Sequence, residues 1–249
     1  MRDDGLFDAT VAATYDADHA DRFAPEVLGP AVDVLAELAE GGRVLELAVG
    51  TGRVALALHA AGVEAAGIEC SQAMADVMAA KPGAQQVPVV IGDMATTRVP
   101  GPFSLVFLVY SSITNLLTQD AQLACFANAA AHLAPGGRFV IEVGVPPLRR
   151  LPPGSKFVAH DASARHIGVD EIDVVAQRMT CHHTYVRDDG SASVFRSHHR
   201  YASPAEYDLM ARLAGLDLFE RWAGWDRAPF TADSTSHISV WQKPIGGAG

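Results

Sequence analysis

The sequence predicts an α/β fold in which helices cover both faces of a largely parallel sheet and an antiparallel β insertion follows. Between residues 43 and 143, short apolar segments alternate with segments of helical periodicity. Glycine-rich turns separate several of these segments, and between residues 156 and 201 the composition changes to β-branched and polar residues. Because strands that alternate with helices form parallel sheets through right-handed crossovers, we expect a Rossmann-like arrangement.

Two helical segments precede the alternating region. Residues 8–23 have the polar, amphipathic composition of a surface helix. Apolar residues then recur at helical spacing over Pro30–Ala39, and Gly41-Gly42 ends this second helix. We assign residues 1–40 to an N-terminal helical cap.

The alternating region, residues 41–148, is expected to form the ligand-binding core. Ser71 is a suitable N-cap for the helix that follows it, because its hydroxyl can accept from a free backbone N–H. The fourth strand is apolar throughout, as in a strand that is covered on both faces. We expect strands at 43–47, 63–69, 87–91, 105–109 and 138–143, and helices at 53–61, 72–81 and 121–133.

The chain after residue 148 divides into two parts. Residues 149–202 are expected to form the antiparallel insertion, in which Asp188-Asp189-Gly190 is typical of a hairpin turn. Residues 203–245 are expected to complete the core with one helix, which begins at Ser203-Pro204. Two final strands are predicted near residues 217–222 and 237–242.

The composition argues against several classes of function and location. The chain has 249 residues, with 19 Lys and Arg against 29 Asp and Glu, which gives a formal net charge of -10. A nucleic-acid partner would require a basic face, so none is expected. The 3 cysteines are far apart and suit a reducing cytoplasm. The sequence has neither a signal-peptide pattern nor an apolar run long enough for a membrane span, so we expect a cytoplasmic protein.

The segment from Val44 to Arg53 carries the main functional signal. A short strand leads into the turn Gly50-Thr51-Gly52, where a helix begins and offers free N–H groups to a ligand. Glu69 ends the next strand, where a carboxylate can accept from two ribose hydroxyls. This segment alone fits S-adenosylmethionine (SAM), a dinucleotide such as NAD or FAD, or a plain structural turn.

Three further features favour SAM. Glu46 lies inside the strand before the turn, where its carboxylate suits a ligand that carries an ammonium group. Asp93 follows the third strand and can accept from an adenine amino group, while Met94 can pack on the ring. The chain ends with Trp241 in an expected antiparallel strand rather than with a second dinucleotide-binding half.

Residues 43–145 resemble the class I SAM-dependent methyltransferases, in particular the actinobacterial small-molecule branch that includes amino-sugar N-methyltransferases. The run Leu133–Phe139 matches the turn before the fifth strand of that family. The chain departs from the family at Ala48, where glycine is usual, at Cys70, where Asp or Asn is frequent, and at Ser104, where aspartate is usual.

The resemblance implies which residues bind the cofactor. It places the methionyl end of SAM at the Glu46–Gly52 loop, the ribose at Glu69 and the adenine at Asp93-Met94. A tyrosine such as Tyr15 closes over the cofactor in related enzymes. The expected cofactor-binding residues are Tyr15, Glu46, Ala48, Gly50, Gly52, Glu69, Cys70, Met74, Asp93, Met94 and Val109.

The methyl acceptor is expected at the carboxyl ends of the parallel strands, under the insertion, which would act as a lid. Tyr110 and Asn115 follow the fourth strand, and Trp225 offers an aromatic wall. No metal site is expected, because the adjacent histidines 182 and 183 point to opposite faces of one strand, as do 198 and 199. The candidates for a catalytic base or an acceptor contact are His183, His199, Tyr201 and His237.

These observations predict an enzyme that transfers the methyl group of SAM to N or O of a small molecule of secondary metabolism, releasing S-adenosylhomocysteine. An in-line attack must align the nucleophile behind the methyl group and exclude water. The alternatives are a nicotinamide-dependent oxidoreductase and a SAM-binding protein that does not methylate. A homodimer is compatible with the sequence.

Overall fold

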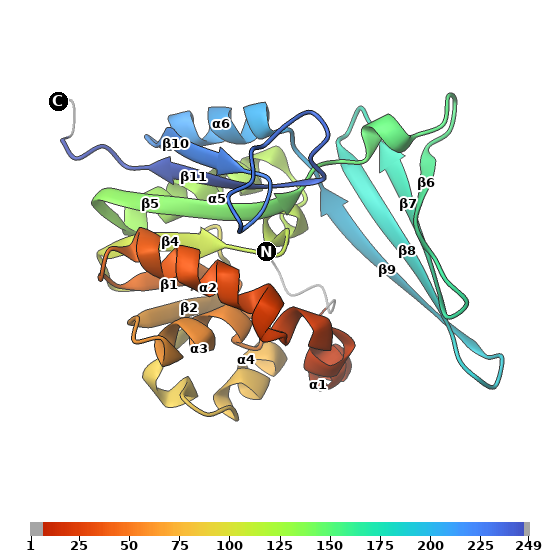
Figure 1. Ribbon diagram of the computed structural model, residues 1–249, viewed down its shortest axis with the longest axis horizontal. Helices are drawn as coiled ribbons and strands as arrows, with labels where there is room; N and C mark the ends of the chain where they lie inside the picture. Colours follow the sequence, from red (N-terminus) through yellow and green to blue (C-terminus); the bar gives the residue numbers. More distant parts are fainter. Residues whose placement is uncertain (1–6, 247–249) are drawn as a thin grey trace.

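The computed structural model describes residues 7–246 and contains two sheets (Figure 1). The larger has seven strands in the order β10-β11-β5-β4-β1-β2-β3. Its first five strands in the chain are parallel, and β11 is antiparallel to β5 with Trp241 opposite Phe139. The strands are β1 (Val44–Leu47), β2 (Ala65–Glu69), β3 (Val89–Ile91), β4 (Phe103–Leu108), β5 (Leu133–Gly144), β10 (Asp217–Trp222) and β11 (Ser236–Gln242).

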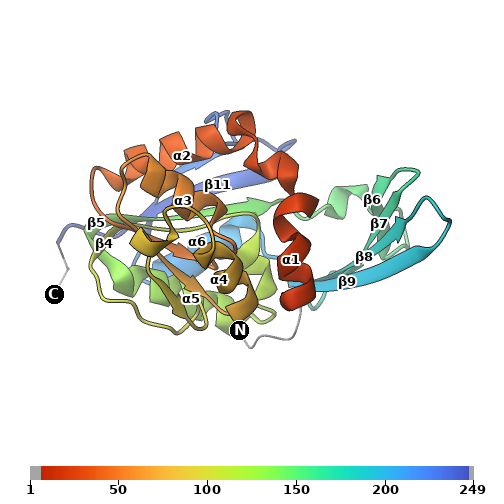
Figure 2. The ribbon, with the colours of Figure 1, turned by 90° about the horizontal axis from the view of Figure 1, so that it is seen from below.

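Helices cover both faces of this sheet, as predicted (Figures 1 and 2). One core cluster joins α2 and α3 to the sheet around Leu35 and Leu58, and the other joins α5 and α6 around Phe126 and Tyr207. All four of these side chains are fully buried. The helices are α1 (Ala9–Asp18), α2 (Pro25–Ala39), α3 (Arg53–Ala60), α4 (Gln72–Ala79), α5 (Gln119–His132) and α6 (Pro204–Leu213).

The predicted helix starts at serine residues are confirmed. Ser71 Oγ accepts from Met74 N at 3.2 Å at the start of α4, and Ser203 Oγ accepts from Glu206 N at 3.3 Å at the start of α6. Each hydroxyl satisfies one of the free N–H groups of its helix. These local contacts fix where the two helices begin.

The start of the second helix was predicted wrongly. Helix α2 begins at Pro25 and not at Pro30, which lies in its interior. A proline suits the first position because its missing N–H would be unpaired there. Both prolines satisfy that rule, so only the packing of the longer helix on the sheet distinguishes them. Strand β5 also begins earlier than expected, at Leu133.

The predicted antiparallel insertion forms the second sheet, with four strands in the order β6-β7-β8-β9. It projects from the end of the core beside α1 (Figures 1 and 2). The predicted turn at Asp188-Asp189-Gly190 joins β8 and β9. The strands are β6 (Phe157–Ala162), β7 (His166–Asp173), β8 (Arg178–Val186) and β9 (Ala192–Arg200).

Candidate functional site

The turn after β1 brings backbone atoms to the carboxyl end of the sheet. Gly50 has φ +58°, and a Cβ placed there would meet only the methyl group of Met74, at 3.6 Å. The space beside Gly50 is therefore open to a ligand. Gly52 differs, because a Cβ there would lie 2.8 Å from Met78 and 2.9 Å from Leu56. Its lack of a side chain serves the packing of α3 on α4.

Ala48 adopts a conformation that favours glycine, with φ 56°. A non-glycine residue in the left-handed region is strained because its Cβ approaches the following carbonyl oxygen.

Exchanging Ala48 for glycine is therefore expected to raise the free energy of unfolding by about 1 kcal/mol. Urea unfolding of the A48G variant measures this, with Ala60→Gly in the exposed end of α3 as a control that should be destabilised. Equal destabilisation in both variants would contradict the strain at Ala48.

Glu46 is buried beside this turn, with 3% of its surface exposed. Its Oε2 accepts from Ala55 N at 2.9 Å, in the first turn of α3. Burial raises the pKa of the Glu46 carboxyl to about 8, while the Arg53 charge and the Ala55 N–H act in the opposite direction. A cation that reached this carboxyl would stabilise its ionised form.

Glu69 links the turn to the next strand end. It is 4% exposed, and its two oxygens accept from Gly50 N at 2.8 Å and from Ser71 N at 2.9 Å. The thiol of Cys70 lies 3.5 Å from Oε1. Oε2 accepts from Gly50 N alone and retains a further lone pair for a hydroxyl donor. Glu69 is thus held at the turn with remaining capacity to accept from a ligand.

Asp93 and Met94 follow β3 at the same end of the sheet. The Oδ1 of Asp93 accepts from Ala95 N at 2.9 Å, which closes a short turn. Met94 is 2% exposed and belongs to the core cluster that includes Ile68. Its backbone carbonyl accepts from Asn128 Nδ2 at 2.8 Å. The side chain of Met94 therefore supports this turn from within the core.

The N-terminal helix is fastened to the same strand ends. Asp16 accepts from Thr51 Oγ1 at 2.6 Å and forms an ion pair with Lys81. Ser71 Oγ donates to the Phe7 carbonyl at 2.6 Å. These bonds hold α1 over the glycine turn, which is where a residue that covers a bound cofactor must lie.

Tyr15 lies on the part of α1 that is held there. Its ring stacks on His19, with ring centroids 4.3 Å apart. Burial raises the pKa of the Tyr15 hydroxyl to about 12, and the nearby Tyr110 acts in the same direction. His19 in turn contacts Tyr110 edge to face, with ring centroids 5.9 Å apart. An aromatic cluster thus connects α1 to the end of β4.

The exit of β4 carries two consecutive strained residues. Tyr110 and Ser111 have φ 56° and φ 58°. Glu142 on β5 holds this turn, because its Oε2 accepts from Tyr110 N at 3.0 Å and its carbonyl accepts from Ser111 N at 2.9 Å. Left-handed non-glycine residues persist only where the surroundings enforce them, and they cluster at functional sites. Val109, before the turn, is buried in the core.

The Tyr110 ring is exposed, and two guanidinium groups lie near it. The guanidinium of Arg22 lies 5.1 Å from the ring centroid and that of Arg53 lies 5.7 Å from it. Asn115 is half-buried at the end of the short helix after this turn. Trp225 is half-buried and packs against the core cluster on the α2 side of the sheet. Tyr110 is linked to Tyr15 through His19 and to the start of α3 through Arg53.

Two of the predicted bases have a ring nitrogen engaged by a neighbour, and His199 has both engaged. His199 Nδ1 lies 3.0 Å from Thr114 Oγ1 and its Nε2 lies 2.8 Å from Ser197 Oγ. His237 is 1% exposed within β11, and its Nδ1 lies 2.8 Å from Ser239 Oγ. Burial lowers the pKa of His199, and it lowers that of His237 to about 4.

The other two predicted bases are Tyr201, directly after β9, and His183 in β8. Tyr201 is buried beside Val158 and Ile172, and its hydroxyl donates to the Asp173 carbonyl at 3.4 Å. His183 Nδ1 lies 2.9 Å from His166 Nε2, and burial lowers the pKa of His183. The four predicted bases therefore occupy separate positions, and the structure does not bring them together.

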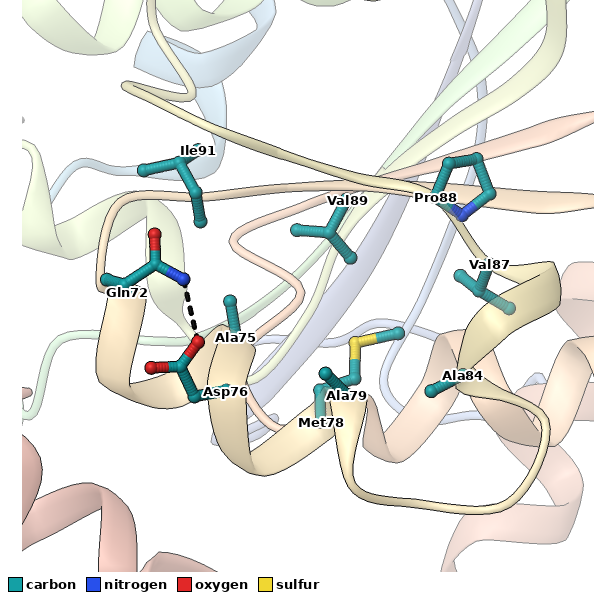
Figure 3. Close-up of a pocket in the computed structure, with 10 residues that line it drawn as sticks. All are labelled: Gln72, Ala75, Asp76, Met78, Ala79, Ala84, Val87, Pro88, Val89 and Ile91. Atoms are coloured by element: carbon teal, nitrogen blue, oxygen red, sulfur yellow. Dashed lines mark hydrogen bonds between the residues drawn. The ribbon is translucent and has the colours of Figure 1, made fainter.

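A groove of about 300 Å³ lies between α4 and β3 at the edge of the sheet (Figure 3). Gln72 and Asp76 face it and share a hydrogen bond of 2.7 Å. The residues that line it include none of the predicted cofactor ligands. We therefore place the functional site at the strand ends, where Glu46, Glu69 and the glycine turn meet.

Comparison with known proteins identifies this arrangement. The methyltransferase domain family matches residues 44–137. The structure of the CcbJ methyltransferase from Streptomyces caelestis is 37% identical in sequence, with a TM-score of 0.78 over 86% of this chain and 88% of that one. The chain is a SAM-dependent methyltransferase. Its fold is that of class I, so the predicted family and fold are confirmed and the oxidoreductase alternative is set aside.

Two further comparisons extend beyond the matched domain. The cypemycin N-terminal methyltransferase of a Streptomyces species is 24% identical over 98% of this chain and 100% of its own length. The SAM-bound structure of CalS10, an amino pentose methyltransferase from Micromonospora echinaspora, is 22% identical, with a TM-score of 0.70 over 92% of this chain and 96% of that one. The methyltransferase fold thus includes the insertion and the C-terminal strands.

The residues of this methyltransferase fit SAM. The open space at Gly50 admits a ligand close to the backbone, and Glu69 Oε2 keeps a lone pair for a ribose hydroxyl. The buried Glu46 carboxyl gains most from a ligand that carries positive charge. SAM supplies a methyl group activated by its sulfonium. Within residues 7–246, no helix is long and apolar enough to cross a membrane.

Sequence reasoning missed several residues of the methyltransferase site. Asp16, Arg53 and Glu142 are fixed by partners 35, 31 and 32 residues away in the chain. No local pattern marks such contacts. A partial signal existed for Arg53, which directly follows the glycine turn and begins α3.

Proposed function

We propose that this methyltransferase acts on an amine nitrogen of a small molecule of secondary metabolism. The observation that carries the proposal is the engagement of the predicted bases. His199 has both ring nitrogens occupied, and His237 is buried in the sheet with a lowered pKa. An amine that arrives neutral needs no base for attack, whereas a hydroxyl acceptor usually does. The names of the cypemycin and amino pentose enzymes support the same class of acceptor.

In the proposed mechanism, the glycine turn holds the methionyl end of the cofactor and Glu69 accepts from the ribose hydroxyls. Asp93 accepts from the adenine amino group. Tyr15, on the helix fastened over the turn, closes the cofactor side and excludes water. Tyr110, beside Arg22 and Arg53, forms the boundary with the acceptor. The enzyme contributes alignment and exclusion of water, since the methyl donor is already activated.

We further propose that residues 149–202 form a lid on the acceptor side. His199 of β9 contacts Thr114 after β4, so this face of the antiparallel sheet adjoins the exit of β4. Successive residues of a strand alternate between faces, which places His183 on the same face as His199 through its neighbour Met179. Side chains of this face are therefore suited to determine which acceptor enters.

The test compares amine acceptors with their hydroxyl analogues. Mixtures that contain amino sugars, peptides with free N termini and their hydroxyl analogues are incubated with the enzyme and SAM, and the products are identified by mass spectrometry. We expect methylated amines and S-adenosylhomocysteine in equal amounts. Methylation of a hydroxyl analogue in preference to its amine would overturn the proposal, as would SAM binding without transfer to any amine.

The raised pKa of Glu46 predicts a pH dependence of cofactor binding. Below its pKa of about 8 the Glu46 carboxyl is mostly protonated, and a bound cation favours the ionised form. Binding of SAM should then release a proton, so affinity should rise by up to about tenfold per pH unit from roughly pH 6 to pH 8. Calorimetric titration in buffers of different ionisation enthalpy measures both quantities. The Glu46→Gln variant should lose the slope, and an unchanged slope would show that another group titrates.

A further inference from the structure

The antiparallel sheet brings three histidines from three different strands together. They are His160 of β6, His166 of β7 and His183 of β8, and one ring nitrogen of each lies within 4.8 Å of the others. The rings of His166 and His183 stack with centroids 5.2 Å apart, and their nearest nitrogens are 2.9 Å apart. The ring of His160 lies 5.1 Å from that of His183.

The strand register explains why these rings converge. His183 lies opposite Gly168, which is two residues from His166 on the same face of β7. His160 lies at a register shift between Ala159 and Asp161 of β6. A Cβ at Gly168 would lie 2.0 Å from His160 Nε2, so only glycine leaves room for that ring. The glycine and the bulge together shape the cluster.

Two carboxylates hold the outer nitrogens of this cluster. Asp161 Oδ2 lies 2.5 Å from His166 Nδ1, and Asp170 Oδ1 lies 2.9 Å from His160 Nδ1. Each contact fixes the proton on Nδ1 and leaves Nε2 with a lone pair, which in His166 lies 2.9 Å from His183 Nδ1. Metal-binding histidines in proteins characteristically donate their other N–H to a carboxylate in this way.

We propose that His160, His166 and His183 bind a divalent first-row transition-metal ion such as zinc. Three neutral imidazoles are a ligand set that zinc accepts, at about 2.0–2.1 Å, with a fourth position left for water or another ligand. No metal site was expected from the sequence, because adjacent histidines of one strand point to opposite faces. The sheet instead brings together one histidine from each of three strands.

The location of the site indicates which class of ligand could occupy the fourth coordination position. The histidines share the sheet face of His199, which contacts Thr114 at the exit of β4. His160 is exposed and the other two are half-buried, so a small ligand can reach the ion. An amine or hydroxyl donor of a molecule under the lid is the chemical class that would occupy the open position.

Metal titration of the tag-free protein tests this site. The protein is stripped with a chelator and titrated with zinc by calorimetry, and the bound metal is counted by elemental analysis. Cobalt is then substituted as a spectroscopic probe, because tetrahedral nitrogen coordination gives intense visible absorption. We expect one zinc per chain and a cobalt spectrum of tetrahedral type, and the absence of stoichiometric binding to the wild-type protein would overturn the proposal.

Variants separate this site from adventitious binding. His183→Ala and His160→Gln should each abolish stoichiometric zinc binding, and Asp161→Asn should weaken it roughly 10- to 100-fold. His198→Ala is the matched control, since His198 lies on the opposite face of β9 and pairs with Thr180. Circular dichroism verifies that each variant is folded. Retention of the zinc by folded H160Q and H183A, or its equal loss in H198A, would contradict the assignment.

Discussion

Replacing Arg200 with alanine is expected to lower the free energy of unfolding by about 3–5 kcal/mol. Arg200 is 5% exposed at the end of β9. Its guanidinium donates to Gln122 at 2.6 Å, to Gln177 at 2.8 Å and to Glu206 at 2.6 Å. The truncation leaves Gln122 Oε1 buried without its partner, and it leaves the half-buried Glu206 carboxylate with only the amide donors of Gln119 and Gln177. The resulting desolvation cost dominates the loss. Urea unfolding followed by circular dichroism measures it.

The Arg200 network also connects the antiparallel sheet to the core. Gln122 belongs to α5, Glu206 to α6 and Arg200 to β9, so one guanidinium joins the antiparallel sheet to two helices of the core. Arg212→Ala, on the exposed side of α6, serves as the control and should change stability by less than about 0.5 kcal/mol. A loss below about 1 kcal/mol for R200A would show that the network is solvated.

The fold was predictable because its signals are local. Serine caps at Ser71 and Ser203 and the turn at Gly190 act over a few residues, so the chain reveals them without tertiary knowledge. The error at Pro30 has the same origin. A proline satisfies the rule for a helix start wherever it stands, and only the packing of α2 on the sheet decides between Pro25 and Pro30.

The approach of Gly50 and Glu69 to each other was predictable from the order of strands and turns. Gly50 and Glu69 stand at strand ends that a parallel sheet must bring together, and the hydrogen bond between them agrees with this. The clamp between Asp16 and Thr51 depends instead on how α1 docks, which no pattern within α1 specifies. The amphipathic pattern expected for residues 8–23 is not found within α1, where Ala12 alone is buried, so the pattern does not indicate the face that binds.

The grouping of histidines in the antiparallel sheet was the least predictable feature, because pairing between distant strands determines it. In the sequence, the conspicuous histidines are the adjacent pairs 182–183 and 198–199. The register instead groups His160, His166 and His183, which are separated by 6 and 17 residues or more. A β-bulge at His160 completes the group, and bulges cannot be located from composition.

The glutamate at the end of β2 gives the largest expected effect on cofactor binding. Replacing Glu69 with alanine should weaken binding of S-adenosylhomocysteine by about 100-fold, because hydrogen bonds to a charged group contribute about 1.5–3 kcal/mol each. The change removes the proposed acceptor of the ribose hydroxyls. It also leaves the N–H groups of Gly50 and Ser71 without their present partner. Calorimetric titration with S-adenosylhomocysteine measures the affinity without turnover.

Two further variants determine whether the Glu69 charge or only the turn is responsible. Glu69→Gln preserves the volume and one acceptor oxygen but removes the charge, so its affinity should fall between those of wild type and E69A. Glu64→Ala removes an exposed carboxylate that pairs with Arg43 at 2.6 Å, and its affinity should equal that of wild type. If E69A unfolds like the wild-type enzyme and binds with unchanged affinity, then Glu69 serves the turn alone. The ribose must in that case be recognised by another strand end, and the proposed position of the cofactor would be wrong.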